Sequence, residues 1–379
     1  MNPPAANAPS SEERLLVRGV NWLGDAVMSI PALRRLREAR PGAHLALLAP
    51  EKLAGLWEGQ SFFDELLLFS SSDSVWQTGR RLRQKKFATG LAFPNSIRSA
   101  LELWLAGIPR RVALGRPFRS LFLTNPVSPR PGAARMRKRS AGEIRHLAAS
   151  RNPPALIPSS AHHVYDYLHL AAALGASTDP IAPRLEISQE EAVAVAARFG
   201  LAPARENRPW LGMNPGAEYG PAKRWPAESF VAAAVAVHKA TGCPWIIFGG
   251  PADRNFVEVI SSAIAQSLPE HAVINLAGKT TLRELAAALR LCRLLLTNDS
   301  GPMHLAAALG TPVVVPFGST SPEMTGPFMV PNARILRAPG IGCAPCFRRD
   351  CPIDFRCMRE IDPAKVVAEV LRGAALKRP

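Results

Sequence analysis

The chain has 379 residues and lacks any apolar run long enough to cross a membrane. A membrane-spanning helix needs roughly 18 or more uninterrupted apolar residues, and runs such as 45–49 have only the length of a buried strand. The amino terminus lacks a basic segment followed by an apolar one, which is the pattern of a secretory signal. We therefore expect a cytoplasmic protein that is not transmembrane and whose six cysteines meet a reducing environment.

Two common nucleotide-binding motifs are also missing. The sequence has neither the Walker pattern G-x-x-x-x-G-K-[ST] nor the dinucleotide fingerprint G-x-G-x-x-G. Walker-type ATP hydrolysis and NAD chemistry therefore lose support.

Acidic residues are scarce, with 30 Asp and Glu against 46 Lys and Arg and a net charge of +16. Such an excess favours an anionic partner, which could be nucleic acid, a phosphorylated substrate or an acidic membrane leaflet. Residues 110–151 contain eleven basic residues and only one acid, Glu143. This stretch is either a solvated loop or an anion-binding surface.

Strand-then-helix units recur in both halves of the chain. In the first half we expect strands at 14–20, 44–49, 65–69 and 88–93, and helices at 25–40, 96–106 and 165–174. In the second half we expect strands at 210–213, 245–248, 294–297 and 313–317, and helices at 230–240, 255–266, 281–290 and 303–309. Such alternation predicts an α/β protein with two parallel sheets, each covered by helices on both faces.

Three short segments at strand ends are candidates for chemistry. In the first, residues 21–25, Asp25 can act as a base or simply cap the following helix. In the second, 214–226, glycines allow close backbone approach and Lys223 and Arg224 can neutralise phosphate, although a solvated turn explains them equally well. In the third, 297–304, a helix start offers free N–H groups to an anion, whereas the plainer interpretation is a capped helix with a packed histidine.

Together these segments resemble the lipopolysaccharide heptosyltransferase family, especially its heptosyltransferase II type. The resemblance rests on N-x-x-G-D at 21–25, N-P-G-A-E-x-G-P-A-K-R-W-P at 214–226 and T-N-D-S-G-x-M-H at 297–304. It implies a GT-B glycosyltransferase fold of two Rossmann-like domains facing a central cleft. It implies an acceptor-binding domain at 11–185 and an ADP-heptose-binding domain at 186–360. The C-terminal helix at 361–379 is expected to pack back on the first domain.

The resemblance also implies residue roles. Asp25 is expected to be the catalytic base, and Lys223 the contact to the donor diphosphate. The other expected donor-binding residues are Gly216, Ala217, Glu218, Asp299, Ser300, Gly301 and His304. The expected acceptor-binding residues are Asn21, Arg135, Arg137, Lys138 and Arg139, the last four from the basic stretch.

The implied reaction is inverting transfer of heptose from ADP-L-glycero-D-manno-heptose to the first heptose of the lipopolysaccharide inner core. It needs no metal or other cofactor for the chemistry. The implied partners are ADP-heptose, a Kdo-lipid A acceptor and the anionic cytoplasmic face of the inner membrane, where the protein would be peripheral. A nucleotide-sugar epimerase of GT-B architecture is the alternative, and a basic nucleic-acid-binding protein ranks below it because no nucleic-acid-binding module is readable.

Four cysteines near the C-terminus pose a separate question. Cys343, Cys346, Cys351 and Cys357 provide the ligand count of a tetrahedral structural zinc site, although their spacing departs from the paired C-x2-C of zinc ribbons. An iron–sulfur cluster, reduced thiols and disulfides are the alternatives.

Overall fold

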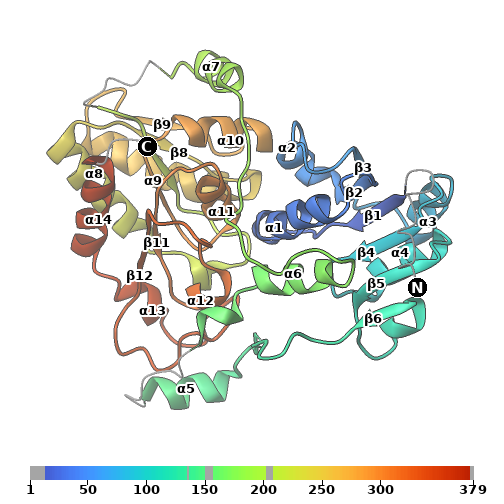
Figure 1. Cartoon of the computed structure of the whole chain (residues 1–379). Helices are drawn as coiled ribbons and strands as arrows, with labels where there is room; N and C mark the ends of the chain where they lie inside the picture. Colours follow the sequence, from blue (N-terminus) through green and yellow to red (C-terminus); the bar gives the residue numbers. More distant parts are fainter. Residues whose placement is uncertain (1–12, 135, 150–156, 202–207, 376–379) are drawn as a thin grey trace, which may run out of the picture. The chain divides into compact units, whose positions relative to one another are not determined.

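The computed structural model describes residues 13–134, 136–149, 157–201 and 208–375, and it divides into two compact units (Figure 1). Unit 1 comprises the chain up to Ala133 together with His163–Ile181, and unit 2 comprises Ala134–His162 and the chain from Ala182 onward. The predicted domain change after residue 185 lies close to the last crossing, between Ile181 and Ala182. The sequence assigned 134–162 to the first domain, however, whereas its contacts place it in unit 2.

Unit 1 is built on a parallel six-stranded sheet in the order β3-β2-β1-β4-β5-β6. Its strands are β1 (Arg14–Arg18), β2 (His44–Pro50), β3 (Glu65–Phe69), β4 (Thr89–Ala92), β5 (Arg110–Leu114) and β6 (Asn125–Val127). Its helices are α1 (Leu23–Ala39), α2 (Ala54–Trp57), α3 (Val75–Arg83), α4 (Ile97–Leu105) and α6 (Val164–Ala172), with 3-10 turns η1 (Glu51–Leu53) and η2 (Arg119–Phe122).

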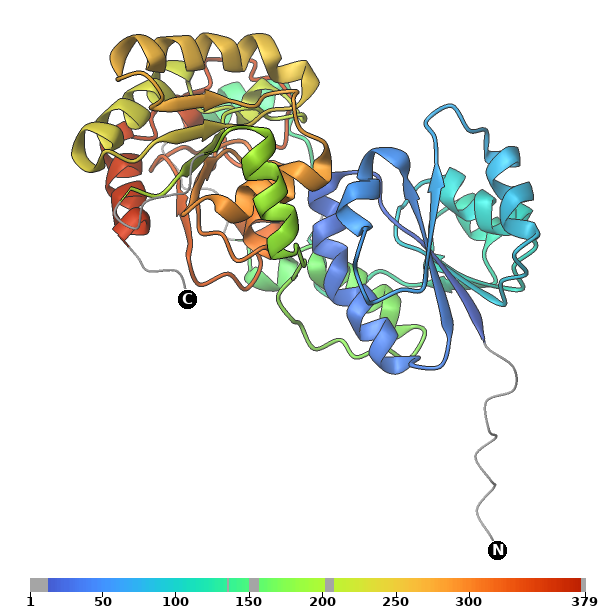
Figure 2. The same cartoon turned by 90° about the horizontal axis from the view of Figure 1, so that it is seen from above.

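Helices cover both faces of this sheet because successive side chains of its strands point to opposite faces. Leu16 packs in one core cluster with Leu82 of α3 and Leu103 of α4. Its neighbours Leu15 and Val17 are equally buried but belong to the other face. There α1 packs with α6, on the opposite side of the sheet from α3 and α4 (Figure 2).

Unit 2 contains a second parallel six-stranded sheet, in the order β12-β11-β10-β7-β8-β9. Its strands are β7 (Leu211–Asn214), β8 (Trp245–Ile247), β9 (Val273–Asn275), β10 (Leu295–Thr297), β11 (Val313–Pro316) and β12 (Ala333–Leu336). Its α-helices are α5 (Ala141–Ala149), α7 (Gln189–Arg198), α8 (Ala227–Thr241), α9 (Arg254–Ser267), α10 (Leu282–Leu291), α11 (Gly301–Ala308), α12 (Pro322–Thr325), α13 (Arg356–Arg359) and α14 (Pro363–Ala375). Its 3-10 turns are η3 (Ser159–Ala161), η4 (Pro221–Lys223) and η5 (Pro251–Asp253).

The C-terminal helix corrects one expectation. α14 packs on α8, β11 and β12, and its Val366 and Val370 are fully buried in the core of unit 2. The prediction that this helix belongs with the first domain is therefore wrong for the described residues, because its apolar face completes the core of unit 2. No helix in the described part of the chain is long and apolar enough to span a bilayer.

The two sheets share one topology, and this topology locates the candidate sites. In each sheet the chain moves outward from the first strand to the third, then returns to the other side of the first strand. Ligands of such sheets bind at the carboxyl ends of the strands where the direction reverses. These switch points lie between β1 and β4 in unit 1 and between β7 and β10 in unit 2, so ligands are expected at the loops that follow these strands.

Candidate active site

Asp25 lies just after β1, at the switch point of unit 1. Helix α1 begins at Leu23 with Trp22 in the N-cap position, so Asp25 is the third residue of the helix and not its cap residue. Its half-buried carboxylate accepts a hydrogen bond from Tyr167, with 3.1 Å between Tyr167 Oη and Asp25 Oδ1. The structure therefore presents Asp25 as an oriented carboxylate at a predicted ligand-binding edge.

Tyr167 is a site residue that the sequence did not reveal. It lies on α6, more than a hundred residues after Asp25, and its ring packs edge-on against Phe93 with centroids 5.3 Å apart. Burial, together with the negative charge of Asp25, raises the pKa of Tyr167 well above its usual value. The phenol therefore stays protonated and remains a donor to Asp25 throughout the physiological pH range.

A buried ion pair supports the loop before Asp25. Arg18, at the end of β1, contacts Glu102 of α4 with 2.8 Å between Nε and Oε2, and both side chains are almost completely buried. Burial lowers the pKa of Arg18, an effect that Glu102 opposes. The same guanidinium donates to Asn21 Oδ1 at 2.9 Å. Asn21 is exposed, and the hydrogen bond from Arg18 fixes the position of its side-chain oxygen. Its expected contact with the acceptor remains a prediction.

Lys223 and Asp299 meet at the switch point of unit 2. Lys223 follows β7 and Asp299 follows β10, and 2.6 Å separates Lys223 Nζ from Asp299 Oδ2. Thr320, in the loop after β11, donates its hydroxyl to the same carboxylate oxygen at 2.5 Å. The side chains are 14% exposed for Lys223 and 4% for Asp299. The sequence predicted the two charged residues as separate donor contacts, and the structure joins them in one ion pair.

Asn298 ties the two predicted donor loops together. Its side-chain amide donates to Pro215 O at 2.7 Å, and its oxygen accepts the Trp225 N–H at 3.0 Å. The side chain is fully buried, so these hydrogen bonds are shielded from water. Neither Asn298 nor Thr320 was among the predicted site residues, because each acts through contacts between loops distant in sequence.

The start of α11 offers an anion site of the expected kind. Ser300 is its N-cap residue and makes no side-chain cap hydrogen bond, and Gly301 is the first helical residue. Ser300 Oγ instead lies 3.3 Å from Thr297 Oγ1. Pro302 has no N–H and the Met303 N–H donates to Ser300 O at 3.1 Å, so the N–H group that this positive helix end offers to an anion is that of Gly301. His304 is buried on this helix, 6% exposed, as the plainer interpretation expected.

The glycine-containing turn after β7 is shaped by close contacts. A Cβ on Gly216 would lie 2.4 Å from Asp253 Oδ2, so any other residue would require the Asp253 carboxylate to move. Asp253 is itself paired with Arg224, with 3.0 Å between Oδ1 and Nη2. Ala217 is buried and Glu218 is exposed. Both predicted cations of this turn are thus paired with a carboxylate of the protein, Arg224 with Asp253 and Lys223 with Asp299.

The cysteine segment, residues 343–357, packs against these donor loops. Tyr219 Oη donates to Phe347 O at 2.7 Å. The backbone N–H groups of Cys346 and Phe347 both donate to Ser319 O, at 3.0 and 2.8 Å. Ser319 directly precedes Thr320, so the cysteine segment supports the residue that binds Asp299.

The cysteines themselves are free thiols. Cys343, Cys346 and Cys357 are buried and Cys351 is half-buried. Within the described residues, no three His, Cys, Asp or Glu side chains are grouped so that they could hold a metal ion. Burial raises the pKa of the Cys343, Cys346 and Cys357 thiols. The four thiols are thus not grouped as metal ligands in the described residues, and the structural zinc site stays a prediction.

The basic residues predicted to bind the acceptor lie in unit 2. Arg139 donates its backbone N–H to Cys346 O at 3.1 Å and its guanidinium to Gly342 O at 3.2 Å. Arg137 is paired with Glu143, with 3.0 Å between Nη1 and Oε2, and Lys138 is exposed. Arg135 lies outside the described residues. Placing this segment in the first domain was wrong, because its long-range contacts are with the cysteine segment.

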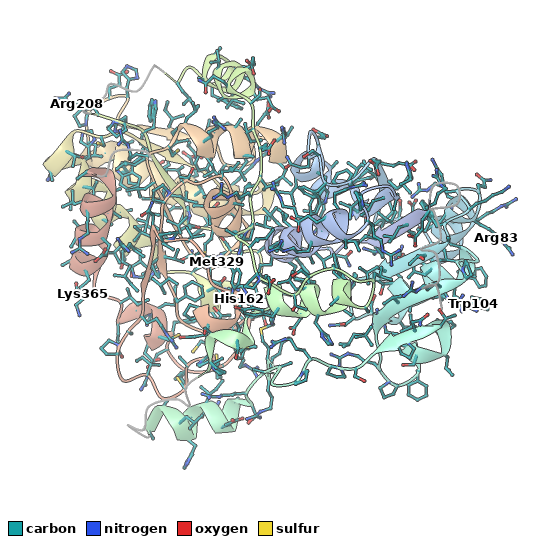
Figure 3. The ribbon with its side chains drawn as sticks, in the orientation of Figure 1. Arg83, Trp104, His162, Arg208, Met329 and Lys365 are labelled. Atoms are coloured by element: carbon teal, nitrogen blue, oxygen red, sulfur yellow. The ribbon has the colours of Figure 1, made fainter. Side chains whose placement is uncertain are left out.

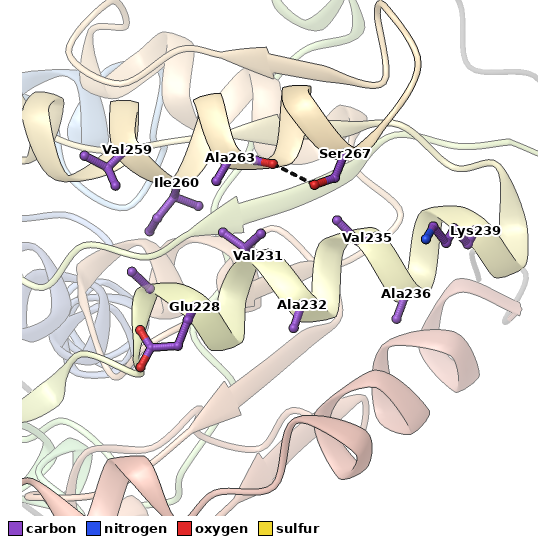
Figure 4. A pocket seen from close by; sticks show the side chains of 11 residues that line it. Glu228, Val231, Ala232, Val235, Ala236, Lys239, Val259, Ile260, Ala263 and Ser267 are labelled. Carbon is purple, nitrogen blue, oxygen red and sulfur yellow. Dashed lines mark hydrogen bonds between the residues drawn. The ribbon is translucent and has the colours of Figure 1, made fainter.

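A groove of about 680 Å³ lies between α8 and α9 (Figure 4). Its walls are largely aliphatic and include Val231, Val235, Val259 and Ile260. It contains none of the predicted site residues and few polar groups that could bind a diphosphate. The groove is therefore separate from the donor loops.

The family follows from comparison with known proteins. Residues 130–355 match the sequence profile of glycosyltransferase family 9 (heptosyltransferase). The chain belongs to this family. Family 9 members are glycosyltransferases, so the chain is an enzyme of that class, and the predicted recognition, fold class and enzyme class are confirmed.

Three relatives illustrate how far the similarity of this family 9 enzyme extends. Lipopolysaccharide heptosyltransferase 2 of Salmonella typhimurium is 29% identical over 330 residues, 86% of this chain and 88% of the relative. Lipooligosaccharide heptosyltransferase 2 of Haemophilus ducreyi is 28% identical over 373 residues, 94% of this chain and 98% of the relative. The solved E. coli ADP-heptose lipopolysaccharide heptosyltransferase II is 27% identical with a TM-score of 0.73, covering 95% of this chain and 98% of its own.

Proposed function

We propose that the enzyme transfers heptose from ADP-heptose to the inner core of lipopolysaccharide with inversion, as a heptosyltransferase of type II. The observation that carries this proposal is the Lys223–Asp299–Thr320 cluster beside the start of α11, at the switch point of unit 2. It combines a cation with a helix N-terminus, as recognition of a diphosphate requires. The names of the relatives supply the sugar and the acceptor class.

In the proposed donor site, Lys223 and the Gly301 N–H at the positive end of α11 stabilise the diphosphate. The negative charge on ADP grows as the bond between its terminal phosphate oxygen and the anomeric carbon breaks. Donors held in place before the reaction stabilise such charge without reorganisation. Asp299 and Thr320 hold the ammonium group of Lys223 at this position.

Asp25 is the proposed general base. The acceptor hydroxyl oxygen attacks the anomeric carbon from the face opposite ADP, and Asp25 takes the hydroxyl proton. One C–O bond forms while the C–O bond to ADP breaks, which inverts the anomeric configuration. A general base contributes on the order of 10²–10⁴-fold, so positioning and charge stabilisation supply the rest.

The proposed acceptor is Kdo-lipid A that carries the first inner-core heptose, met at the cytoplasmic face of the inner membrane. Its phosphates and acidic sugars agree with the excess of 46 basic over 30 acidic residues. The enzyme would be peripheral there.

The two rival functions receive less support. An epimerase would need only the donor site, and a basic nucleic-acid-binding protein would need neither Asp25 nor the donor cluster. The family match and the similarity to heptosyltransferase 2 over most of the chain favour transfer to an acceptor.

The proposal predicts selective use of ADP-heptose. In an assay with purified acceptor, ADP-heptose should support transfer, whereas the UDP- and GDP-linked sugars should not. ADP alone should raise the melting temperature more than UDP or GDP does, because a ligand that binds only the folded state stabilises it.

The assay should give the same rate in EDTA, since we propose that no metal ion takes part. Free heptose without a transferred product would instead support the epimerase, and loss of activity in EDTA would contradict the metal-independent reaction.

Tyr167→Phe should lower kcat roughly tenfold and leave ADP affinity unchanged, since a hydrogen bond to a charged group is worth about 1.5–3 kcal/mol. The substitution removes the hydroxyl that orients Asp25 but keeps the ring against Phe93. Tyr165→Phe, two residues earlier on α6, is the matched control and should retain wild-type kcat. Equal kcat for the two variants would show that Tyr167 does not position the base.

A further inference from the structure

Large apolar side chains are exposed on one layer of unit 1. Of the six that unit 1 exposes within its described residues, five lie on α3, on α4, on η2 or directly before η2. They are Trp76 (65% exposed), Ile97 (50%), Trp104 (45%), Phe118 (77%) and Leu121 (78%). Single exposed apolar residues are common, whereas a group of them marks an interaction surface.

Contacts between the three elements make this layer continuous. α3 packs on α4, and Arg98 at the start of α4 donates to Asp73 O just before α3 at 2.7 Å. Trp104 of α4 stacks edge-on with Phe122 of η2, with ring centroids 5.9 Å apart. The buried Arg119 of η2 donates to Ser96 O at 3.1 Å, at the other end of α4. We call this surface the α3–α4–η2 layer.

Phe118 is difficult to explain by folding alone. Its φ angle is 61°, in the left-handed region that a bulky side chain rarely adopts, and its ring is 77% exposed. The residue therefore gains neither a favourable backbone conformation nor burial. Strained residues persist most often where they serve a function, and here the strain accompanies an aromatic ring displayed to solvent.

In and beside this layer, Arg81 and Arg98 are paired with Asp73 and Glu102, whereas other exposed cations have no acidic partner among the described residues. Residues 73–122 contain ten Lys and Arg but only two acids, of which Glu102 is buried against Arg18. Four exposed basic residues make no ion pair with any described residue, namely Arg80, Arg83, Lys86 and Arg116. Arg83 and Trp104 both extend outward from the layer (Figure 3). By contrast, Arg137 of unit 2 is paired with Glu143.

We propose that the α3–α4–η2 layer is the surface by which the enzyme binds an anionic lipid bilayer. Aromatic and aliphatic side chains enter the headgroup region, where Trp is favoured, while uncompensated arginines attract the negative surface. The aliphatic Leu121 and Ile97 favour a bilayer over nucleic acid, because they have no ring to stack on a base. The inference rests on the proposed function in one respect, because that function supplies a membrane-anchored acceptor as the reason for the enzyme to bind a bilayer.

Vesicle binding tests the layer directly. Wild-type protein should cosediment with phosphatidylcholine vesicles that contain phosphatidylglycerol and much less with phosphatidylcholine alone. Arg80→Gln/Arg83→Gln/Arg116→Gln should lower the partition coefficient on the order of 100-fold. Phe118→Ser/Leu121→Ser should lower it at least about tenfold. These side chains are exposed, so melting temperatures should stay at the wild-type value.

Matched controls replace residues of the same kind in unit 2. Val193→Ser/Val259→Ser removes two aliphatic side chains that are 57% and 66% exposed. Lys239→Gln/Lys365→Gln removes two exposed cations of α8 and α14. Both controls should bind vesicles as the wild type does. Loss of binding in a control with retention in the layer variants would overturn the proposal, as would stronger binding of wild type to RNA or DNA than to anionic vesicles.

An activity readout separates this inference from the proposed function. With a lipid-free acceptor fragment the layer variants should transfer heptose at the wild-type rate, and with acceptor in anionic vesicles they should be slower. Vesicle binding that depends on the layer but comes without any heptose transfer would refute the function and keep the surface. If heptose is transferred but vesicle binding is the same in the layer variants as in the wild type, the proposed bilayer-binding surface is wrong and the proposed function still holds.

Discussion

Asp25→Asn is expected to lower kcat by about 100-fold or more, the range for loss of a general base. The amide has nearly the same shape, and its oxygen can still accept the hydrogen bond from Tyr167 Oη. It cannot take a proton from the acceptor hydroxyl. The fold and the affinity for ADP should therefore be unchanged, because the proposed nucleotide contacts lie in unit 2.

Asp179→Asn is the matched control, since Asp179 is an exposed carboxylate of the same unit far along the chain from the proposed base. It should retain wild-type turnover. Stopped assays with saturating donor and acceptor would give kcat for both variants, and calorimetry would give ADP affinity. A kcat within a few-fold of wild type for Asp25→Asn would mean that Asp25 only stabilises the start of α1, a role that Asn fills almost as well as Asp.

Lys223→Ala is expected to weaken ADP binding roughly 10- to 150-fold, from the loss of a charged hydrogen bond worth about 1.5–3 kcal/mol. The loss has a second component, because the 4%-exposed Asp299 carboxylate would then face the diphosphate without its cation. The melting temperature should also fall, since a buried charge left without its partner is unfavourable. The acceptor KM should stay unchanged.

Lys365→Ala, which removes an exposed lysine of α14, controls for the change in net charge (Figure 3). Calorimetric titration with ADP and kcat/KM for each substrate distinguish the two variants. Lys223→Ala/Asp299→Asn would show how much of the effect comes from the unpaired carboxylate. Wild-type donor parameters for Lys223→Ala would assign this lysine to the structure of the loop and not to the donor.

The positions of the central strands of both sheets could be predicted from the sequence. Strands β1, β2, β7 and β10 were expected within a few residues of their bounds, since a strand buried on both faces is a nearly continuous apolar run. Of the outer strands, β3 has a short apolar run and was expected at its observed bounds, whereas β5, β6 and β12 were not expected. β5 begins with Arg110 and Arg111, which the sequence assigned to a basic stretch, and edge strands β6 and β12 are largely exposed or half-buried.

The candidate-site residues that could be predicted from the sequence are those that lie within a short recognisable motif. Asp25, Lys223 and Asp299 lie in motifs that a family resemblance identifies. Tyr167 and Thr320 lie outside those motifs, and only tertiary contacts bring them to Asp25 and Asp299. The same limit explains the misplaced segment around Arg139, whose contact to Gly342 spans about two hundred residues and leaves no local pattern.

The support that the cysteine segment gives to the donor loops has a consequence for synthesis of the chain. Ser319 O accepts hydrogen bonds from residues 346 and 347, and Trp225 Nε1 donates to Ile361 O at 3.2 Å. The donor loops therefore lack these hydrogen-bond partners until residues near the carboxyl end have left the ribosome. Unit 1 depends on none of these residues, so its core can form while the remainder of the chain is still being translated. The nascent enzyme should acquire its base before it can bind its nucleotide.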